Sequence, residues 1–265
     1  MRGSAGTKQD FPWWLVIIAV TGLVLFLRVA TDADYANVLR VMARGIWITV
    51  YVTLISYALA CLLGLALALG QLSRWLAVRQ VSRLYVEVMR GIPIIVLLLY
   101  VSFALAPVLV ELWNAATAGF GFAPATGRDF PFIWRAVIAL TLAYASFLAE
   151  VFRAGLLSVD KGQIEAAEAL GLSRWQRFRH VVWPQAFRTV LPPLGNDFVA
   201  MIKDSSLVSV VGVADITQLG KTFAAGNFRY LETYNVMALI YLTMTICLSL
   251  VLRWVEQRLR AKSQR

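Results

Sequence analysis

The chain has 265 residues, of which 60% are hydrophobic and 15% are charged, and its formal net charge is +10. A soluble domain of this size has roughly a quarter of its residues charged, so the composition excludes an ordinary soluble protein. Lys and Arg form short clusters between long apolar runs, which favours basic loops beside a membrane over a nucleic-acid-binding surface. Two cysteines in apolar stretches and a single histidine exclude a disulfide framework and a histidine-based metal site.

Six segments qualify, or nearly qualify, as transmembrane helices, which need about 20 mostly apolar residues. They lie near 12–30, 46–72, 92–112, 133–152, 190–213 and 233–252. We favour a retained anchor over a signal peptide for the first, because no small-residue cleavage pattern follows it. The fifth contains prolines and charges, so it either lines a polar path or does not cross. The sequence predicts an all-α integral membrane protein with about six transmembrane helices.

Charge bias orients these segments. With a cytoplasmic N-terminus, the internal segments hold 17 Lys and Arg residues and the external loops hold 5. The internal segments are 1–11, 73–91, 153–189 and 253–265, and the external loops are 31–45, 113–132 and 214–232. Because basic residues concentrate in cytoplasmic loops, both termini are predicted to be cytoplasmic. The fifth segment is predicted to cross, since otherwise the basic C-terminal cluster would lie outside. The apolar-aromatic stretch 120–134 is expected to form a short interfacial element on the outer surface.

The internal loop 153–189 shows the clearest local signals. Residues 163–170 are strong helix formers, and Gly171 stands where a glycine ends a helix. Ser173 opens a capping-box pattern for a second helix, which Pro184 interrupts or joins to the next element. Two short helices with a tight elbow would suit a groove on another protein, and an ordinary solvated loop is an equal alternative.

Polar residues in the fifth segment are candidates for lining a path through the membrane. Charges at membrane depth usually pair with one another or face water, and residues seven apart share a helical face. One interpretation is a lining for a zwitterionic substrate, and the alternative is a structural ion pair or a helix break. Glu150, by contrast, is expected to pair with Arg153. The candidate path residues are Asn196, Asp197, Lys203, Asp204 and Ser205.

The loop also carries a family pattern. Glu165-Ala166-Ala167, then Gly171, then Val181-Val182-Trp183-Pro184 after nine residues resembles the EAA loop of binding-protein-dependent ABC importer permeases. Trp183 departs from the usual leucine. Arg90-Gly91-Ile92-Pro93 and Lys203-Asp204-Ser205-Ser206-Leu207 resemble the polar amino-acid permeases of that family. The resemblance covers about residues 40–255.

The resemblance implies a type I importer core of five helices in 41–265, with the coupling loop 153–189 and a C-terminal tail. Residues 1–40 would add a cytoplasmic N-terminus, one further helix and an external loop. It further implies a bacterial inner-membrane protein that pairs with a second permease and receives polar amino acids from an extracytoplasmic binding protein. A scaffolding half without its own substrate site, or an importer of another small polar solute, are the alternatives. The expected ATPase contacts are Glu165, Ala166, Ala167 and Gly171.

No catalytic residue, metal site or cofactor is expected in this chain. ATP and Mg²⁺ would be bound by the partner ATPase dimer, which the resemblance implies. Leu219-Gly220-Lys221-Thr222 resembles the end of a phosphate-binding loop, but Asp215 stands where that loop needs a glycine. A membrane-embedded enzyme is disfavoured because the sequence shows no nucleophile set and no paired-carboxylate metal motif.

Overall fold

The computed structural model describes residues 13–263, and all regular structure within that range is helical. This confirms the all-α prediction. The elements are α1 (Trp13–Thr31), α2 (Ala33–Gln71), α3 (Leu76–Gly91), α4 (Ile94–Tyr100), the π-helix η1 (Val101–Leu105), α5 (Ala106–Thr117), α6 (Phe132–Leu157), α7 (Lys161–Ala169), α8 (Arg174–Arg177), the π-helix η2 (Phe178–Val182), α9 (Trp183–Asp204), the 3-10 helix η3 (Ser205–Val211), α10 (Ile216–Asn227) and α11 (Tyr230–Ser263).

The core forms where α6 packs along α2, because small residues let the two helices come close. A β-carbon on Gly64 of α2 would lie only 3.0 Å from the carbonyl oxygen of Ala145 on α6. Ala136, Ala139 and Ala143 of α6 are likewise buried. Close approach through small residues is typical of membrane helix pairs, in which van der Waals packing replaces the hydrophobic effect.

Within the described residues 13–263, four helical segments are long and apolar enough to cross a membrane: α2, α4 to α5 (Ile94–Thr117), α6 and α11. The apolar part of α1 is shorter, Val16–Thr31. The 22-residue α9 is long enough to span, but it carries the polar and charged residues of the predicted fifth segment. Those six segments are the ones the sequence predicted, although α1 and α9 fall short of the apolar criteria.

Several predicted bounds are wrong. Residues 33–45 were expected in an external loop, but Asp32 caps α2 and the helix runs on from Ala33. The fifth helix begins at Trp183 and ends at Asp204, after which the chain tightens into η3. Pro184 is the second residue of this element, directly after the π-helix η2.

Two helices that the sequence analysis missed lie in predicted loops. The amphipathic α3 lies in the internal segment 73–91, and α10 lies in the external segment 214–232. In the stretch 120–134, residues up to 131 form turns and irregular structure before α6 begins at Phe132, and its expected place at the outer membrane surface stays a prediction. The division at residue 40 stays a prediction, and α2 continues across it.

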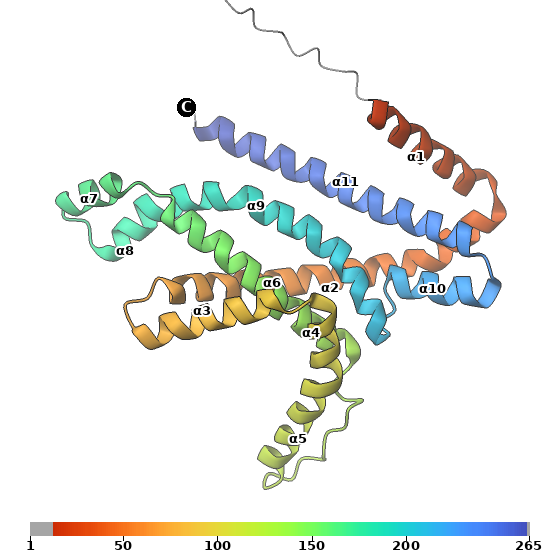
Figure 1. The fold of residues 1–265 in the computed structure, drawn as a ribbon, viewed down its shortest axis with the longest axis horizontal. Helices are drawn as coiled ribbons and strands as arrows, with labels where there is room; N and C mark the ends of the chain where they lie inside the picture. Colours follow the sequence, from red (N-terminus) through yellow and green to blue (C-terminus); the bar gives the residue numbers. More distant parts are fainter. Residues whose placement is uncertain (1–12, 264–265) are drawn as a thin grey trace, which may run out of the picture.

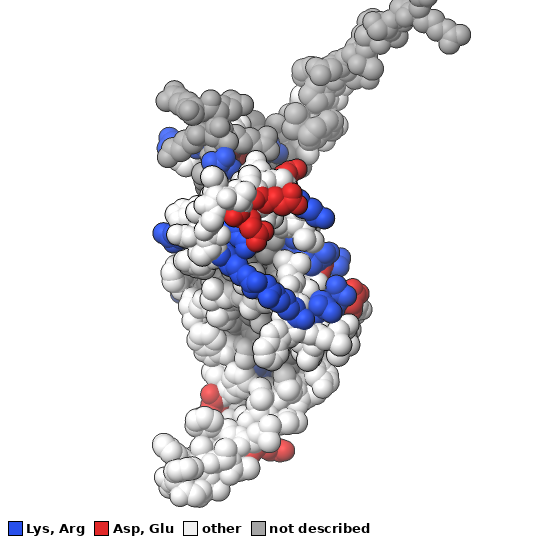
Figure 2. Space-filling view, turned by 90° about the vertical axis from the view of Figure 1, so that its left-hand side faces the viewer, with Lys and Arg blue, Asp and Glu red and all other residues white. Residues whose placement is uncertain are grey.

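The helices α2, α9 and α11 contact one another along the body of the protein, while α4, η1 and α5 branch away from it (Figure 1). The short helices α7 and α8 lie at one end and α10 at the other (Figure 1). Figure 2 looks onto the end that carries α7 and α8, where Lys, Arg, Asp and Glu gather. Charge concentrated at this end is what the predicted cytoplasmic side would show, and the orientation itself stays a prediction.

Candidate functional site

The helix α7 is closed by local hydrogen bonds at both ends. The Asp160 side chain accepts a hydrogen bond from the Gly162 backbone N–H at 2.7 Å, which caps the N-terminus. At the other end Gly171 adopts φ +74°, and its N–H donates to the Glu168 carbonyl at 2.9 Å. The Leu172 N–H donates to the Ala167 carbonyl at 3.1 Å, which completes a Schellman motif. The predicted helix stop at Gly171 is confirmed.

The second helix of the elbow begins as predicted, and Pro184 marks its junction with the next element, which was one of the two predicted alternatives. Ser173 Oγ accepts from the Gln176 N–H at 3.4 Å, and the Ser173 N–H donates to Gln176 Oε1 at 2.9 Å, which is a complete capping box. The helix then passes through the wider π-helix η2 directly into α9. A proline ring collides with the carbonyl four residues earlier in an α-helix, and the wider π turn gives Pro184 the room it needs.

Two side-chain contacts hold α7 against the helices that follow it, one to α8 and one to α9. Arg177 Nη1 lies 3.0 Å from Glu168 Oε2, and Gln185 Nε2 donates to Gln163 Oε1 at 2.6 Å. The elbow formed by 160–185 is therefore fixed at both ends of α7 and across to α8 and α9. A movement of α7 would be passed directly to the long helix α9.

The outer surface of the elbow combines charge with a small apolar tip. Glu165, Ala166 and Gly171 are exposed, as the predicted contact requires. Ala167 is only 4% exposed, so its side chain packs inside the elbow. Leu170 is 81% exposed, and the sequence analysis missed it. The available signal was an apolar residue directly before the helix-ending glycine.

An aromatic ladder continues from the elbow into α9. The rings of Trp175, Phe178, Trp183 and Phe187 are in consecutive contact, with centroids 5.8 to 6.0 Å apart. The five-residue step from Phe178 to Trp183 stays on one face because η2 is a π-helix. Trp183, which departs from the family pattern, is therefore accommodated as the middle of this ladder.

The structure separates the five candidate path residues by exposure. Asn196 and Lys203 are exposed, and Asp197 is half-buried. Asp204 Oδ2 accepts a hydrogen bond from the Tyr144 hydroxyl at 2.7 Å. Ser205 is buried and donates to the carbonyl three residues earlier at 2.7 Å. Within residues 13–263 none of the five forms an ion pair, and the helix break after Asp204 was one of the predicted alternatives.

Two tyrosines that the sequence analysis missed bind the polar helix to its neighbours. Besides Tyr144 of α6, Tyr57 of α2 donates from its hydroxyl to the Leu194 carbonyl at 2.7 Å. Closer to the elbow, Arg153 pairs with Glu150 as predicted, and Gln71 donates to the same carboxylate at 3.2 Å. These contacts join α2, α6 and α9 around the polar helix.

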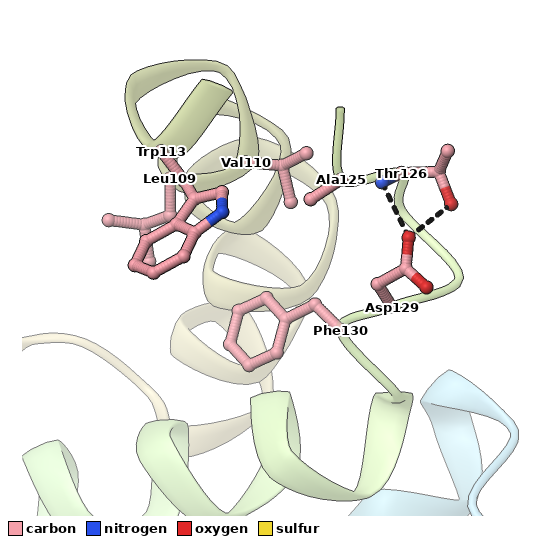
Figure 3. Close-up of a pocket in the computed structure, with 7 residues that line it drawn as sticks. All are labelled: Leu109, Val110, Trp113, Ala125, Thr126, Asp129 and Phe130. Atoms are coloured by element: carbon pink, nitrogen blue, oxygen red, sulfur yellow. Dashed lines mark hydrogen bonds between the residues drawn. The ribbon is translucent and has the colours of Figure 1, made fainter. Parts of the chain in front are cut away.

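Where α5 branches away from the body of the protein, a pocket of about 380 Å³ lies between α5 and the loop that precedes α6. Figure 3 shows Trp113 and Phe130 facing this space from the two sides, with Asp129 hydrogen-bonded to Thr126 at its edge. The other lining residues are Leu109, Val110 and Ala125.

A buried arginine fixes that loop. Arg135 is 7% exposed and donates to the carbonyls of Phe130, Ser102 and Gly127 at 2.8, 2.8 and 2.5 Å. Its Cζ also lies 4.5 Å from the centroid of the Phe132 ring. These contacts fix the conformation of the loop that precedes α6.

Comparisons with known proteins agree with this arrangement. A model of the family described as the binding-protein-dependent transport system inner membrane component matches residues 60–261. The glutamine transport system permease protein GlnP of Escherichia coli K12 is 36% identical over 220 residues, which cover 83% of this chain and 93% of GlnP. The arginine transport system permease protein ArtQ of Bacillus subtilis is 30% identical, with 82% and 92% covered.

Solved structures give the same result. The crystal structure of an amino acid ABC transporter with histidines contains a chain that is 32% identical to this one, with a TM-score of 0.72. The match covers 85% of this chain and 97% of that one. A bacterial transporter for import of the acidic polysaccharide alginate, at 15% identity and a TM-score of 0.68, shares the fold. The chain therefore belongs to the family of binding-protein-dependent transport system inner membrane components, and it is the permease subunit of an ABC importer.

Proposed function

We propose that this chain moves polar amino acids inward across the bacterial inner membrane, by alternating access driven by a cytoplasmic ATPase dimer. A binding protein delivers the substrate on the outside, and a second permease chain completes the path. The observation that carries the proposal is the fixed elbow 160–185, which joins an exposed small tip to the polar helix α9. Relatives named for glutamine and arginine transport support the substrate class.

The elbow has the properties of a part that docks into a groove. Leu170 is an apolar side chain exposed on a charged end of the protein, where no lipid covers it in the proposed orientation. Ala166 beside it has a small side chain, so the helix surface projects little at that point, and Glu165 adds a charge at the edge. Burying a leucine side chain in a partner contributes about 1.5 to 3 kcal/mol, enough for this residue to dominate a small contact.

The helix α9 carries exposed polar side chains that would suit a path through the membrane. Asn196 and Lys203 are exposed on a helix that lies among membrane helices. A lysine at the centre of a bilayer costs about 2.5 to 3.5 kcal/mol on insertion scales. A watery path shared with the second permease removes that cost and gives both residues access to a polar substrate.

The docking proposal is tested by purifying the tagged chain in mild detergent with its ATPase. We expect Glu165→Arg and Leu170→Glu to lose the ATPase or to uncouple ATP hydrolysis from uptake, while the permease stays in the membrane. Glu111→Arg reverses a charge at an exposed position of α5 and serves as the control. Normal ATPase recovery and coupling in both elbow variants would contradict the docking.

A second test separates a substrate-bearing permease from a scaffolding half. Lys203→Ala is expected to abolish amino-acid uptake while the assembly with ATPase and second permease is preserved. Unchanged uptake, with unchanged apparent affinity, would favour the scaffolding alternative.

A further inference from the structure

Arg90 occupies the last turn of α3, at the point where the chain breaks before α4. The helix α3 runs beside α2 from the end where α7 and α8 lie (Figure 1). Arg90 is 14 residues beyond Leu76, which at 1.5 Å per residue places it about 21 Å along the helix. Its guanidinium lies over the ring of Phe147, 5.9 Å from the centroid. Phe147 is 15 residues from the start and 10 from the end of α6, so the contact lies well inside the length of a membrane helix, although the sequence analysis assigned Arg90 to an internal loop.

This guanidinium is exposed and lacks an oxygen partner. Within residues 13–263, Arg90 makes no hydrogen bond and no ion pair, and its recorded side-chain contact is with Phe147. Glu150 is near enough for electrostatic attraction, but its two oxygens are already engaged by Arg153 and Gln71. A permanent and unpaired charge beside the middle of a membrane helix is the kind of group that marks a functional site.

A chain of side-chain contacts leads from Arg90 of α3 through two aromatic residues of α6 to a carboxylate of α9. The ring of Phe147 contacts that of Tyr144, with centroids 6.0 Å apart, and the Tyr144 hydroxyl donates to Asp204. A cation therefore stands at one end of an aromatic pair and a carboxylate at the other. The two ionic groups of an α-amino acid are bonded to one carbon and cannot reach both ends, so only the cation, Arg90, is assigned to the substrate.

We propose that Arg90 binds the carboxylate of the transported amino acid, a role that rests on the function proposed above. The planar guanidinium forms paired hydrogen bonds to a carboxylate, which a lysine cannot reproduce. The Phe147 ring beside the guanidinium offers an aromatic face to the body of the substrate. The proposal adds α3 and the Gly91 break to the path residues of α9.

The binding protein also recognises the substrate, so the test leaves it out. Permease and ATPase are purified together into lipid nanodiscs, and thermal stabilisation is measured with each of the twenty L-amino acids. The one that stabilises most is then titrated by calorimetry beside its carboxamide, which lacks the negative charge. Charge-assisted hydrogen bonds correspond to about 10-fold to 150-fold in affinity.

In the wild-type complex we expect the carboxamide to bind at least 10-fold more weakly than the acid. Arg90→Ala is expected to weaken acid binding by at least 10-fold and to bind acid and carboxamide alike, with Arg90→Lys between the two. The control is Arg83→Ala, which removes an exposed arginine two turns earlier on the same face of α3 and is expected to bind as wild type.

Three outcomes overturn the role of Arg90: wild-type acid affinity in Arg90→Ala, equal weakening of acid and carboxamide binding, or loss of the second permease chain from the complex. The last would make Arg90 an interface residue. A wild-type complex that no amino acid stabilises contradicts the proposed amino-acid substrate itself, and that result is distinct from the other three.

Discussion

Val190 of α9 packs directly against the α-carbon of Gly155 in α6, leaving no space for a β-carbon at that position. The same β-carbon would lie 3.3 Å from the Ala186 carbonyl oxygen. This contact is where the helix entering the elbow meets the helix leaving it. The elbow can keep its position relative to the membrane helices only while these two backbones stay close.

Gly155→Ala is expected to separate α6 from α9 and to lower the melting temperature. Overpacking costs about 1 to 3 kcal/mol, and the better helix propensity of alanine offsets only about 1 kcal/mol of it. Gly226→Ala is the matched control, because a β-carbon there meets nothing within 4 Å in α10. Adding Val190→Ala to Gly155→Ala should recover part of the loss. Thermal melts in detergent measure the three variants beside the wild type, and a Gly155→Ala melting temperature at or above that of the wild type would contradict the prediction.

Gly171→Val is expected to weaken the elbow without unfolding the protein. Gly171 has φ +74° and open space around it, so the cost comes from backbone strain of about 1 to 2 kcal/mol in the left-handed region. The expected result is lower transport-coupled ATP hydrolysis with a nearly unchanged melting temperature. Gly119→Val, at a glycine without positive φ and with nothing nearby, serves as control. Full coupling in Gly171→Val would show that the Schellman geometry is dispensable.

The parts of this structure that the sequence predicted are those set by local chemistry. Gly171 and Ser173 end and begin helices through hydrogen bonds to residues within a few positions. The Glu150 and Arg153 pair was predicted because the two are one turn apart. The apolar length of a span is likewise a local property, which is why the positions of most membrane helices were found.

What could not be predicted depends on neighbours that are distant in sequence or on alternatives of nearly equal energy. The contact of Tyr144 with Asp204 joins residues 60 apart, and no pattern in one sequence marks it. The π-helix before Pro184 differs from a simple break only in how the turn accommodates the ring. The start of α2 was missed because its first turns are polar, although Asp32 is a recognisable cap.

Arg135→Lys is expected to release the loop 118–131 even though the charge is kept. A lysine ammonium cannot reach three separate carbonyls in the fixed fork that arginine provides, and each lost hydrogen bond from a charged group costs about 1.5 to 3 kcal/mol. Hydrogen–deuterium exchange should rise across the loop and the melting temperature should fall. Arg128→Lys, at an exposed neighbouring position, should leave both unchanged. Equal protection of the loop in wild type and Arg135→Lys would exclude this role.

The same loop is expected to loosen in acid because of Asp129. Backbone N–H and hydroxyl hydrogen bonds from Thr126 hold the pKa of the Asp129 carboxyl below its ordinary value of 3.8. A lowered pKa in the folded loop means that the stabilisation is complete above the unfolded value and is lost as the pH falls through the folded one. Loop order should therefore be constant at neutral pH and decline only below about pH 4.

A nitroxide label on Ala123→Cys can follow that decline, in a protein whose Cys61 and Cys247 are replaced by alanine. Its mobility should rise reversibly at low pH in this background. Asp129→Asn removes the titrating group, so its label mobility should not depend on pH over the same range. If the Asp129→Asn protein shows the same acid transition, the loosening comes from another carboxyl group, and the hydrogen bonds from Thr126 are not what makes the loop sensitive to acid.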